Sequence, residues 1–285
     1  LESAPAAFEE ALALNPAGIR ISGDYVDALE IQLAEAENAG VAVICTGCSG
    51  EPIGAIKDTS IDGDAQNTVW GQILSSYIIE NQSAEEVAGI EVFALPAPAL
   101  LTFNLEFADN MENLCRDCSV IETIVDVNDL EFAPTLIADT MSTSLGRWAV
   151  LDSGEISTDV PAALADALVF EPIVLIGRGA NARDIAIMQE LAASGAVPPE
   201  KGTIDASPEA ALALQAWTGL PVPVMGWRVI DQFARILAGE ALADGSLPSQ
   251  LLTVTNVAEA ALDESGNYLG VADYREQFTG LWGVN

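Results

Sequence analysis

Short runs of β-branched residues alternate with helix-like stretches along this chain of 285 residues, and this alternation limits its fold more than any other feature. The run GIRISG at 18–23 ends at a glycine, which is typical of a buried strand. The stretch 24–39 carries an apolar stripe at helical spacing, beginning at Val26, and acidic residues elsewhere, which favours a helix. The run GVAVICT at 40–46 is again a predicted strand.

The same cycle continues through most of the sequence. The predicted strands are 18–23, 40–46, 90–95, 120–127, 148–152 and 173–177. The predicted helices are 4–14, 24–39, 68–80, 101–114, 133–144, 157–168, 182–193 and 225–238. From residue 244 onward turns predominate, with one short helix near 274–281. Strands that alternate with helices favour parallel sheets covered by helices on both faces, so the predicted fold class is α/β.

In parallel sheets of this kind a ligand binds beyond the carboxyl ends of the strands. Five loops follow predicted strands, and several are polar or rich in glycine: 46–49, 96–99, 126–129, 152–154 and 178–181. Asp126, Asp129 and Asp152 lie there and can accept hydrogen bonds from sugar hydroxyls, and a turn presents Arg178 to the same cleft. Each loop alone is better explained as an ordinary connection, so the prediction rests on their convergence.

Three aromatic residues are candidates for stacking against a ligand: Phe103, Trp217 and Trp227. For Trp227, packing of its helix against a sheet is the better interpretation. The loop GRGAN at 177–181 follows a strand and opens a helix, as phosphate-binding loops do. It lacks the spacing of a dinucleotide or P-loop motif, so a nucleotide site is a weak alternative.

Charge excludes several functions. The chain has 43 acidic and 10 basic residues and no histidine, which gives a formal net charge of −33. No basic surface for nucleic acid can be built from this composition. Without histidine, a Ser-His-Asp triad, a histidine-ligated metal and a histidine proton shuttle are impossible. The acidity indicates either a plain acidic exterior or adaptation to high salt.

Four cysteines form two Cys-x-x-Cys pairs, Cys45 with Cys48 and Cys115 with Cys118. A four-thiolate zinc site is disfavoured because the predicted fold places the pairs at opposite poles. A thioredoxin-like redox motif fits Cys45 and Cys48 weakly. A local disulfide, formed in an oxidising compartment, is the preferred interpretation for Cys115–Cys118 and a less firm one for Cys45–Cys48.

The order of motifs along the sequence resembles a known family, the ribose-binding-like, type I sugar-binding proteins of ABC transporters. The similar stretches are NPAGIRISG (15–23), AGVAVIC (39–45), NLCRDCSV (113–120), GWRVIDQFARILAG (226–239) and YREQFTGLWGV (274–284). The resemblance implies two Rossmann-like lobes with parallel sheets, joined by hinge strands, that clamp a small ligand. It implies a first lobe of residues 1–65 and 220–250, a second lobe of 66–219, and a tail of 251–285 that packs on both.

The resemblance also implies which residues contact the ligand. Carried over position by position, they are Thr46, Gly47, Cys48, Phe103, Asp152, Ser153, Arg178 and Trp217. The first hinge crossing falls at Asp62 to Asn67, and a second lies near Leu220. Two departures stand out. The usual polar ligand positions are often altered, and the sequence resembles the family only from the point after its first strand–helix–strand unit.

These observations predict a non-catalytic, extracytoplasmic receptor that captures a small polar ligand, most simply a sugar, and delivers it to a membrane permease. No cofactor and no metal are expected. The apolar runs are too short to span a membrane, and the first residues do not resemble a signal peptide, as in a mature secreted protein or one anchored by lipid through a preceding segment. The alternatives are the effector-binding core of a transcription regulator and, less favoured, an α/β enzyme.

Overall fold

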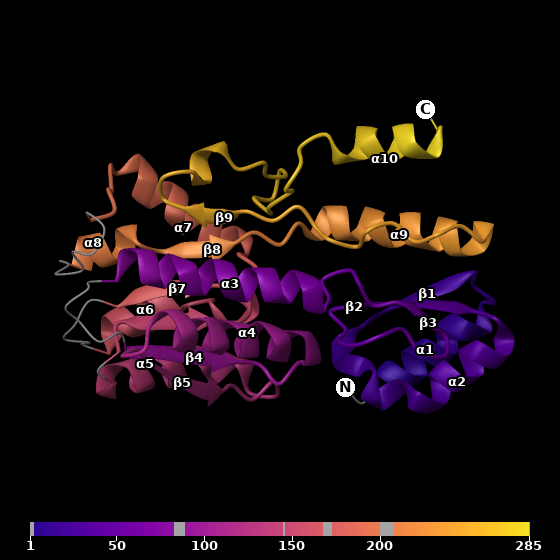
Figure 1. Ribbon diagram of the computed structural model, residues 1–285, viewed down its shortest axis with the longest axis horizontal. Coiled ribbons are helices and arrows are strands. Elements are labelled where there is room, and N and C mark those ends of the chain that lie inside the picture. Colours follow the sequence, from indigo (N-terminus) through magenta and orange to yellow (C-terminus); the bar gives the residue numbers. More distant parts are fainter. Residues whose placement is uncertain (1–2, 83–88, 145, 168–172, 200–207, 285) are drawn as a thin grey trace.

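The computed structural model describes residues 3–82, 89–144, 146–167, 173–199 and 208–284. In these ranges the chain forms two α/β lobes that lie side by side (Figure 1). Lobe 1 contains a three-stranded parallel sheet in the order β1-β2-β3. Lobe 2 contains a six-stranded sheet in the order β5-β4-β6-β7-β8-β9, in which only β9 is antiparallel to its neighbour. The predicted fold class is thus confirmed.

The strands are short and lie where β-branched residues cluster. In lobe 1 they are β1 (Gly18–Ser22), β2 (Ala42–Thr46) and β3 (Ile56–Asp58). In lobe 2 they are β4 (Gly89–Ala94), β5 (Ser119–Ile124), β6 (Trp148–Leu151), β7 (Val174–Gly177), β8 (Ala216–Thr218) and β9 (Leu251–Thr253). Sequence analysis missed β3, β8 and β9, because three residues are too few to show a period of two.

Helices cover both faces of each sheet. Those of lobe 1 are α1 (Ala4–Ala13), α2 (Glu30–Ala39) and α9 (Val222–Ala238). Those of lobe 2 are α3 (Asp64–Asn81), α4 (Pro98–Leu114), α5 (Ala133–Thr143), α6 (Val160–Asp166), α7 (Ala182–Ala193) and α8 (Pro208–Ala213). The predicted helix 24–39 is shorter, because 3-10 turns η1 (Gly23–Tyr25) and η2 (Asp27–Leu29) precede α2. The predicted helix 157–168 corresponds to α6, and its expected last residue, Leu168, lies outside the described residues.

Because successive side chains of a strand point to opposite faces of its sheet, a hydrophobic core forms on each face of each sheet. In lobe 1, Val43 and Cys45 face α1 and α2, whereas Ile44 faces α9. In lobe 2, Leu151 on β6 packs among residues of α5, α6 and α7, and its neighbour Val150 packs among residues of α3, α4 and α8. Strands β2 and β6 are therefore buried on both faces, as their apolar sequences indicate.

The segment 251–284 runs along both lobes (Figure 1). Its strand β9 pairs with β8, and the 3-10 turn η5 (Val257–Glu259) packs against α7. Helix α10 (Tyr274–Trp282) packs against α9, where Trp282 stacks on Trp227 with ring centroids 5.3 Å apart. The interpretation of Trp227 as a packing residue agrees with this contact. None of the helices in the described ranges combines the length and the apolar character that a membrane-spanning segment requires.

Candidate functional site

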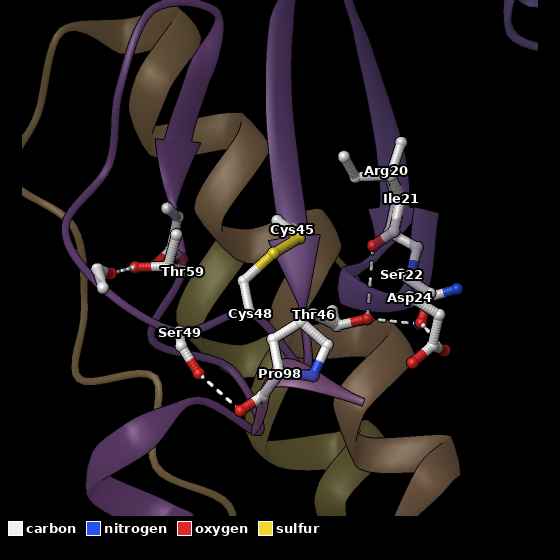
Figure 2. The surroundings of a disulfide bond; sticks show 12 residues. Arg20, Ile21, Ser22, Asp24, Cys45, Thr46, Cys48, Ser49, Thr59 and Pro98 are labelled. Carbon is white, nitrogen blue, oxygen red and sulfur yellow. Dashed lines mark hydrogen bonds between the residues drawn. A yellow bond between two sulfur atoms is a disulfide. The ribbon is translucent and has the colours of Figure 1, made fainter. Parts of the chain in front are cut away.

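The two sheets direct their carboxyl ends toward the junction between the lobes. In lobe 1 the loop after β2 reaches the start of α4, where Ser49 Oγ donates a hydrogen bond to the carbonyl of Pro98 at 2.9 Å (Figure 2). The backbone N–H of Gly50 donates to Asp64 Oδ2 at 2.8 Å, at the start of α3. The η1 turn after β1 also lies against α4. The loops that follow β1 and β2 therefore contact lobe 2 directly.

The lobe 1 wall of this junction consists of the ends of β1 and β2 (Figure 2). Arg20 donates to the hydroxyl of Thr46, and Thr46 Oγ1 lies 3.4 Å from the carbonyl oxygen of Ile21. The next residue, Gly47, adopts φ +69°, a conformation that favours glycine, and donates its N–H to the Ile61 carbonyl. Cys48 then closes the turn through a disulfide to Cys45. Thr46, Gly47 and Cys48 thus form a loop at the end of β2 that hydrogen bonds and a disulfide hold in place.

The lobe 2 wall is built around Asp152, which directly follows β6. Its Oδ2 atom accepts the backbone N–H of Leu95 at 2.9 Å and the side-chain amide of Asn104 at 3.1 Å. Burial raises the pKa of Asp152 to about 7, although these two hydrogen bonds and the charge of Arg178 oppose that rise. Within the described residues, Asp152 Oδ1 and Asn104 Oδ1 are buried without a hydrogen-bond partner. Two acceptors are therefore left for a donor from outside the chain.

Arg178 follows β7 and connects lobe 2 to the first crossing between the lobes. Its terminal nitrogen lies 2.6 Å from Asp62 Oδ1, and its Nε donates to Asn67 Oδ1 at 2.7 Å. The guanidinium carbon lies 4.6 Å from the centre of the Trp70 ring, which adds a cation–π contact. The guanidinium is thus enclosed by a carboxylate, an amide and an indole.

The other predicted polar site residues have partners within their own turns. Ser153 Oγ accepts the N–H of Glu155 and caps the 3-10 turn η4 (Gly154–Ile156). Asp126 accepts two hydrogen bonds from Asn128 in an exposed turn after β5, and Asp129 is exposed nearby. These acidic residues make no contact with Asp152 or Arg178 in the described structure.

Phe103 and Trp217 belong to the core of lobe 2. Phe103 is fully buried on α4 and lies against Phe107, with ring centroids 6.2 Å apart. Trp217 on β8 is 1% exposed and packs under Gly177. Neither ring offers a free face to a ligand in this structure. Leu220, the predicted second hinge residue, packs against core residues of both lobes.

Sequence analysis named Asn67 only as a hinge position, and it missed Trp70 and Asn104. Asn104 lies on the apolar stripe of α4, and a polar residue on a buried stripe is a usable signal. Trp70 and Asn67 lie on the buried stripe of α3 and carry the same signal more weakly.

The remaining motifs have structural explanations. Cys115–Cys118 forms a disulfide between the end of α4 and the start of β5. The described residues hold no group of three side chains suited to a metal ion. At the start of α7, Asn181 and Asp184 form a capping box, so the protein itself occupies backbone donors that a phosphate would need. Burial raises the pKa of Asp184 to about 6.

Comparison with known proteins relates this geometry to one fold. No family model and no curated protein matches the sequence. Among solved structures, the Caulobacter myo-inositol binding protein bound to myo-inositol superposes with a TM-score of 0.68 at 14% identity, over 90% of this chain and 80% of that chain. The chain has the fold of type I solute-binding proteins of ABC transporters.

Two further solute-binding structures agree. An ABC sugar transporter subunit from Rhodobacter sphaeroides has a TM-score of 0.65 and 18% identity, with 87% of this chain and 81% of that chain covered. The 5-methylthioribose transporter solute-binding protein from Thermotoga lettingae has a TM-score of 0.66 and 13% identity, with 97% and 82% covered. The two-lobe architecture expected from the resemblance is therefore confirmed.

Proposed function

We propose that this protein is a non-catalytic solute receptor that closes its two lobes on a small, neutral, polyhydroxylated ligand such as a sugar or a cyclic polyol. The observation that carries the proposal is the pair of unpartnered acceptors, Asp152 Oδ1 and Asn104 Oδ1, beside the strand ends where the lobes meet. Buried acceptors without partners are costly, and hydroxyl groups of a ligand would satisfy them.

The proposed site combines both walls. Thr46, Gly47 and the Cys48 turn line it from lobe 1, and Asp152, Asn104 and Arg178 line it from lobe 2. A neutral ligand is favoured because an acidic one would bring a second negative charge next to the buried Asp152 carboxyl, in a chain of net charge −33. Hinge closure would let groups from both lobes contact one ligand.

In this proposal the receptor acts outside the cytoplasm and delivers its ligand to the permease of an ABC transporter. The fold supports the role, since the similar proteins are described as transporter subunits or solute-binding proteins. Both bonded cysteine pairs support the location, because disulfides persist in oxidising compartments.

Calorimetry with a panel of pentoses, hexoses, inositols, alditols, nucleosides and sugar acids tests the proposal. We expect at least one neutral member to bind, and Asp152→Asn to weaken it about tenfold or more, as for loss of a hydrogen bond to a charged group. The exposed Asp126→Asn is the matched control and should leave the affinity within about twofold. Failure of the whole panel to bind, or equal loss in both variants, would contradict the proposed site.

A further inference from the structure

Arg178 carries a contact that ligand capture does not require. Its side chain is 6% exposed, and that of its partner Asp62 is 13% exposed. Asp62 follows Ile61, which is buried in the core between β2 and α9 of lobe 1. Arg178 follows β7 in the middle of the lobe 2 sheet. The ion pair therefore joins the two lobes across the first crossing of the chain.

The crossing itself is fixed by the same contacts. Asp62 has φ +55°, a conformation that is uncommon for a residue other than glycine. The side-chain amide of Asn67 donates to the carbonyls of Asp62 and Gly63, at 2.9 and 3.0 Å, while its oxygen accepts from Arg178. Backbone and side chains of the crossing are thus held in one arrangement around the guanidinium.

We propose that Arg178 and Asp62 form an internal latch that holds the lobes closed in the absence of ligand. The carboxylate of Asp62 gives the guanidinium an internal partner, so closure does not depend on a ligand to neutralise that charge. Opening the hinge so that the two groups separate would leave a charge buried without its partner, which is strongly unfavourable. The latch rests on the two-lobe closure of the proposed function, but it needs no ligand.

Two further contacts between the lobes are exposed and therefore weaker. Ser49 Oγ to the Pro98 carbonyl is an exposed hydrogen bond, and Gly50 N–H to Asp64 is exposed as well. Water can replace both at little cost. Closure without ligand is therefore expected to depend on Arg178 and Asp62 rather than on these contacts.

The test is small-angle X-ray scattering of the ligand-free protein, supported by hydrogen exchange at residues 59–67. We expect the wild type to match the closed arrangement, and Arg178→Gln and Asp62→Asn each to increase the radius of gyration and the exchange rate of the crossing. The double variant should open no further than either single variant, because both remove the same contact. Added salt should not open the wild type, since a buried pair is screened weakly.

Arg183→Gln is the matched control, because Arg183 pairs with Asp159 at 2.6 Å in lobe 2 but both side chains are more than half exposed, at 54% and 61%. It should scatter like the wild type. Circular dichroism and a melting curve check that each variant folds, and Asp62→Asn, which keeps the shape of the side chain, serves if Arg178→Gln does not fold. An unchanged scattering profile in the folded variants overturns the latch, whether or not any sugar binds, and a failed sugar screen leaves this result standing.

Discussion

Asn104 on α4 donates its side-chain amide to the same Asp152 oxygen that accepts the backbone N–H of Leu95, the residue that follows β4. This arrangement ties helix α4 to the ends of the two neighbouring strands β4 and β6 in lobe 2. It also leaves Asp152 Oδ1 and the amide oxygen of Asn104 without a hydrogen-bond partner within the described residues. A buried carboxyl that accepts hydrogen bonds at only one of its two oxygens should make the stability of the protein depend on pH.

Asp152 should make the protein less stable as the pH rises. Its pKa of about 7 lies above the value of roughly 3.9 in an unfolded chain. The folded state thus binds this proton more tightly, and the resulting stability is fully present below about pH 4 and lost as the pH rises through about 7. Asp152→Asn should remove this decline, at most about 4 kcal/mol, as measured by urea unfolding at several pH values.

Asp184 provides the matched control for this prediction. Its pKa of about 6, also raised mainly by burial, places its own loss of stability at lower pH. Asp184→Asn should therefore flatten the profile only below about pH 6, whereas Asp152→Asn should flatten it up to about pH 7. Identical profiles for the wild type and both variants would show that neither carboxyl titrates in the folded state as described.

Replacement by alanine at two glycines should change the free energy of unfolding in opposite directions. A Cβ on Gly177 would lie 2.8 Å from ring carbons of the buried Trp217, and a rigid indole in a packed core cannot yield cheaply. We expect Gly177→Ala to destabilise the protein by about 1–3 kcal/mol. A Cβ on Gly226, inside α9, meets nothing within 4 Å, so Gly226→Ala should stabilise it by about 0.5–1 kcal/mol.

Urea unfolding of both variants against the wild type measures these changes. The prediction fails if Gly177→Ala unfolds at the same urea concentration as Gly226→Ala. That result would mean that Trp217 has space to move.

The contrast between these positions also indicates how far the sequence alone can be interpreted. Apolar runs such as 40–46 and 173–177 predict their strands because a short continuous apolar run, bounded by turn residues, is typical of a strand buried on both faces. Trp217 looked like a stacking residue because its three-residue strand gave no pattern. Phe103 was assigned to the ligand by position, whereas its helical spacing to Phe107 already placed it in the core.

The candidate site was less accessible to sequence analysis. The strand-end loops identified Thr46, Asp152 and Arg178, because a parallel sheet gathers such loops at one edge. The partner of Arg178 lies 116 residues away in the sequence, and no local pattern connects Asp62 to it. Contacts of this kind depend on how two lobes are placed, which charge and periodicity do not determine.

The two disulfides should differ in their reaction with a mild reductant. Cys45 is fully buried and Cys48 is 5% exposed, whereas Cys115 and Cys118 are only partly buried. Thiolate attack requires access to a sulfur, so Cys115–Cys118 should be reduced first. Alkylation with a mass tag at increasing dithiothreitol, followed by peptide mapping, measures the order.

Loss of the more accessible bond should have a modest cost. Each bridge spans a sequence separation of 3, and closing so short a loop stabilises the fold by about 2 kcal/mol in the chain-entropy treatment. The double variant Cys115→Ser/Cys118→Ser should therefore remain folded, with a lower melting temperature. Labelling of Cys45 and Cys48 at the same reductant concentration as the other pair would contradict the predicted order.

Salt should stabilise this protein. A net charge of −33 on 285 residues makes the compact state repel itself, and this repulsion is released on unfolding. Raising NaCl from about 0.1 M to about 1 M shortens the Debye length from about 10 Å to about 3 Å and screens the repulsion. The melting temperature should rise, at about 2–4 °C for each kcal/mol gained in a chain of this size.

A variant with fewer acids separates this effect from general effects of salt. Replacing the exposed Glu10, Glu35, Asp117 and Glu276 by their amides removes four negative charges without touching the core. Its melting temperature should be higher than that of the wild type at low salt, and its gain from added NaCl should be smaller, with KCl giving the same result. If the variant and the wild type gain equally, salt acts through preferential exclusion from the surface, and self-repulsion does not limit the stability of the fold.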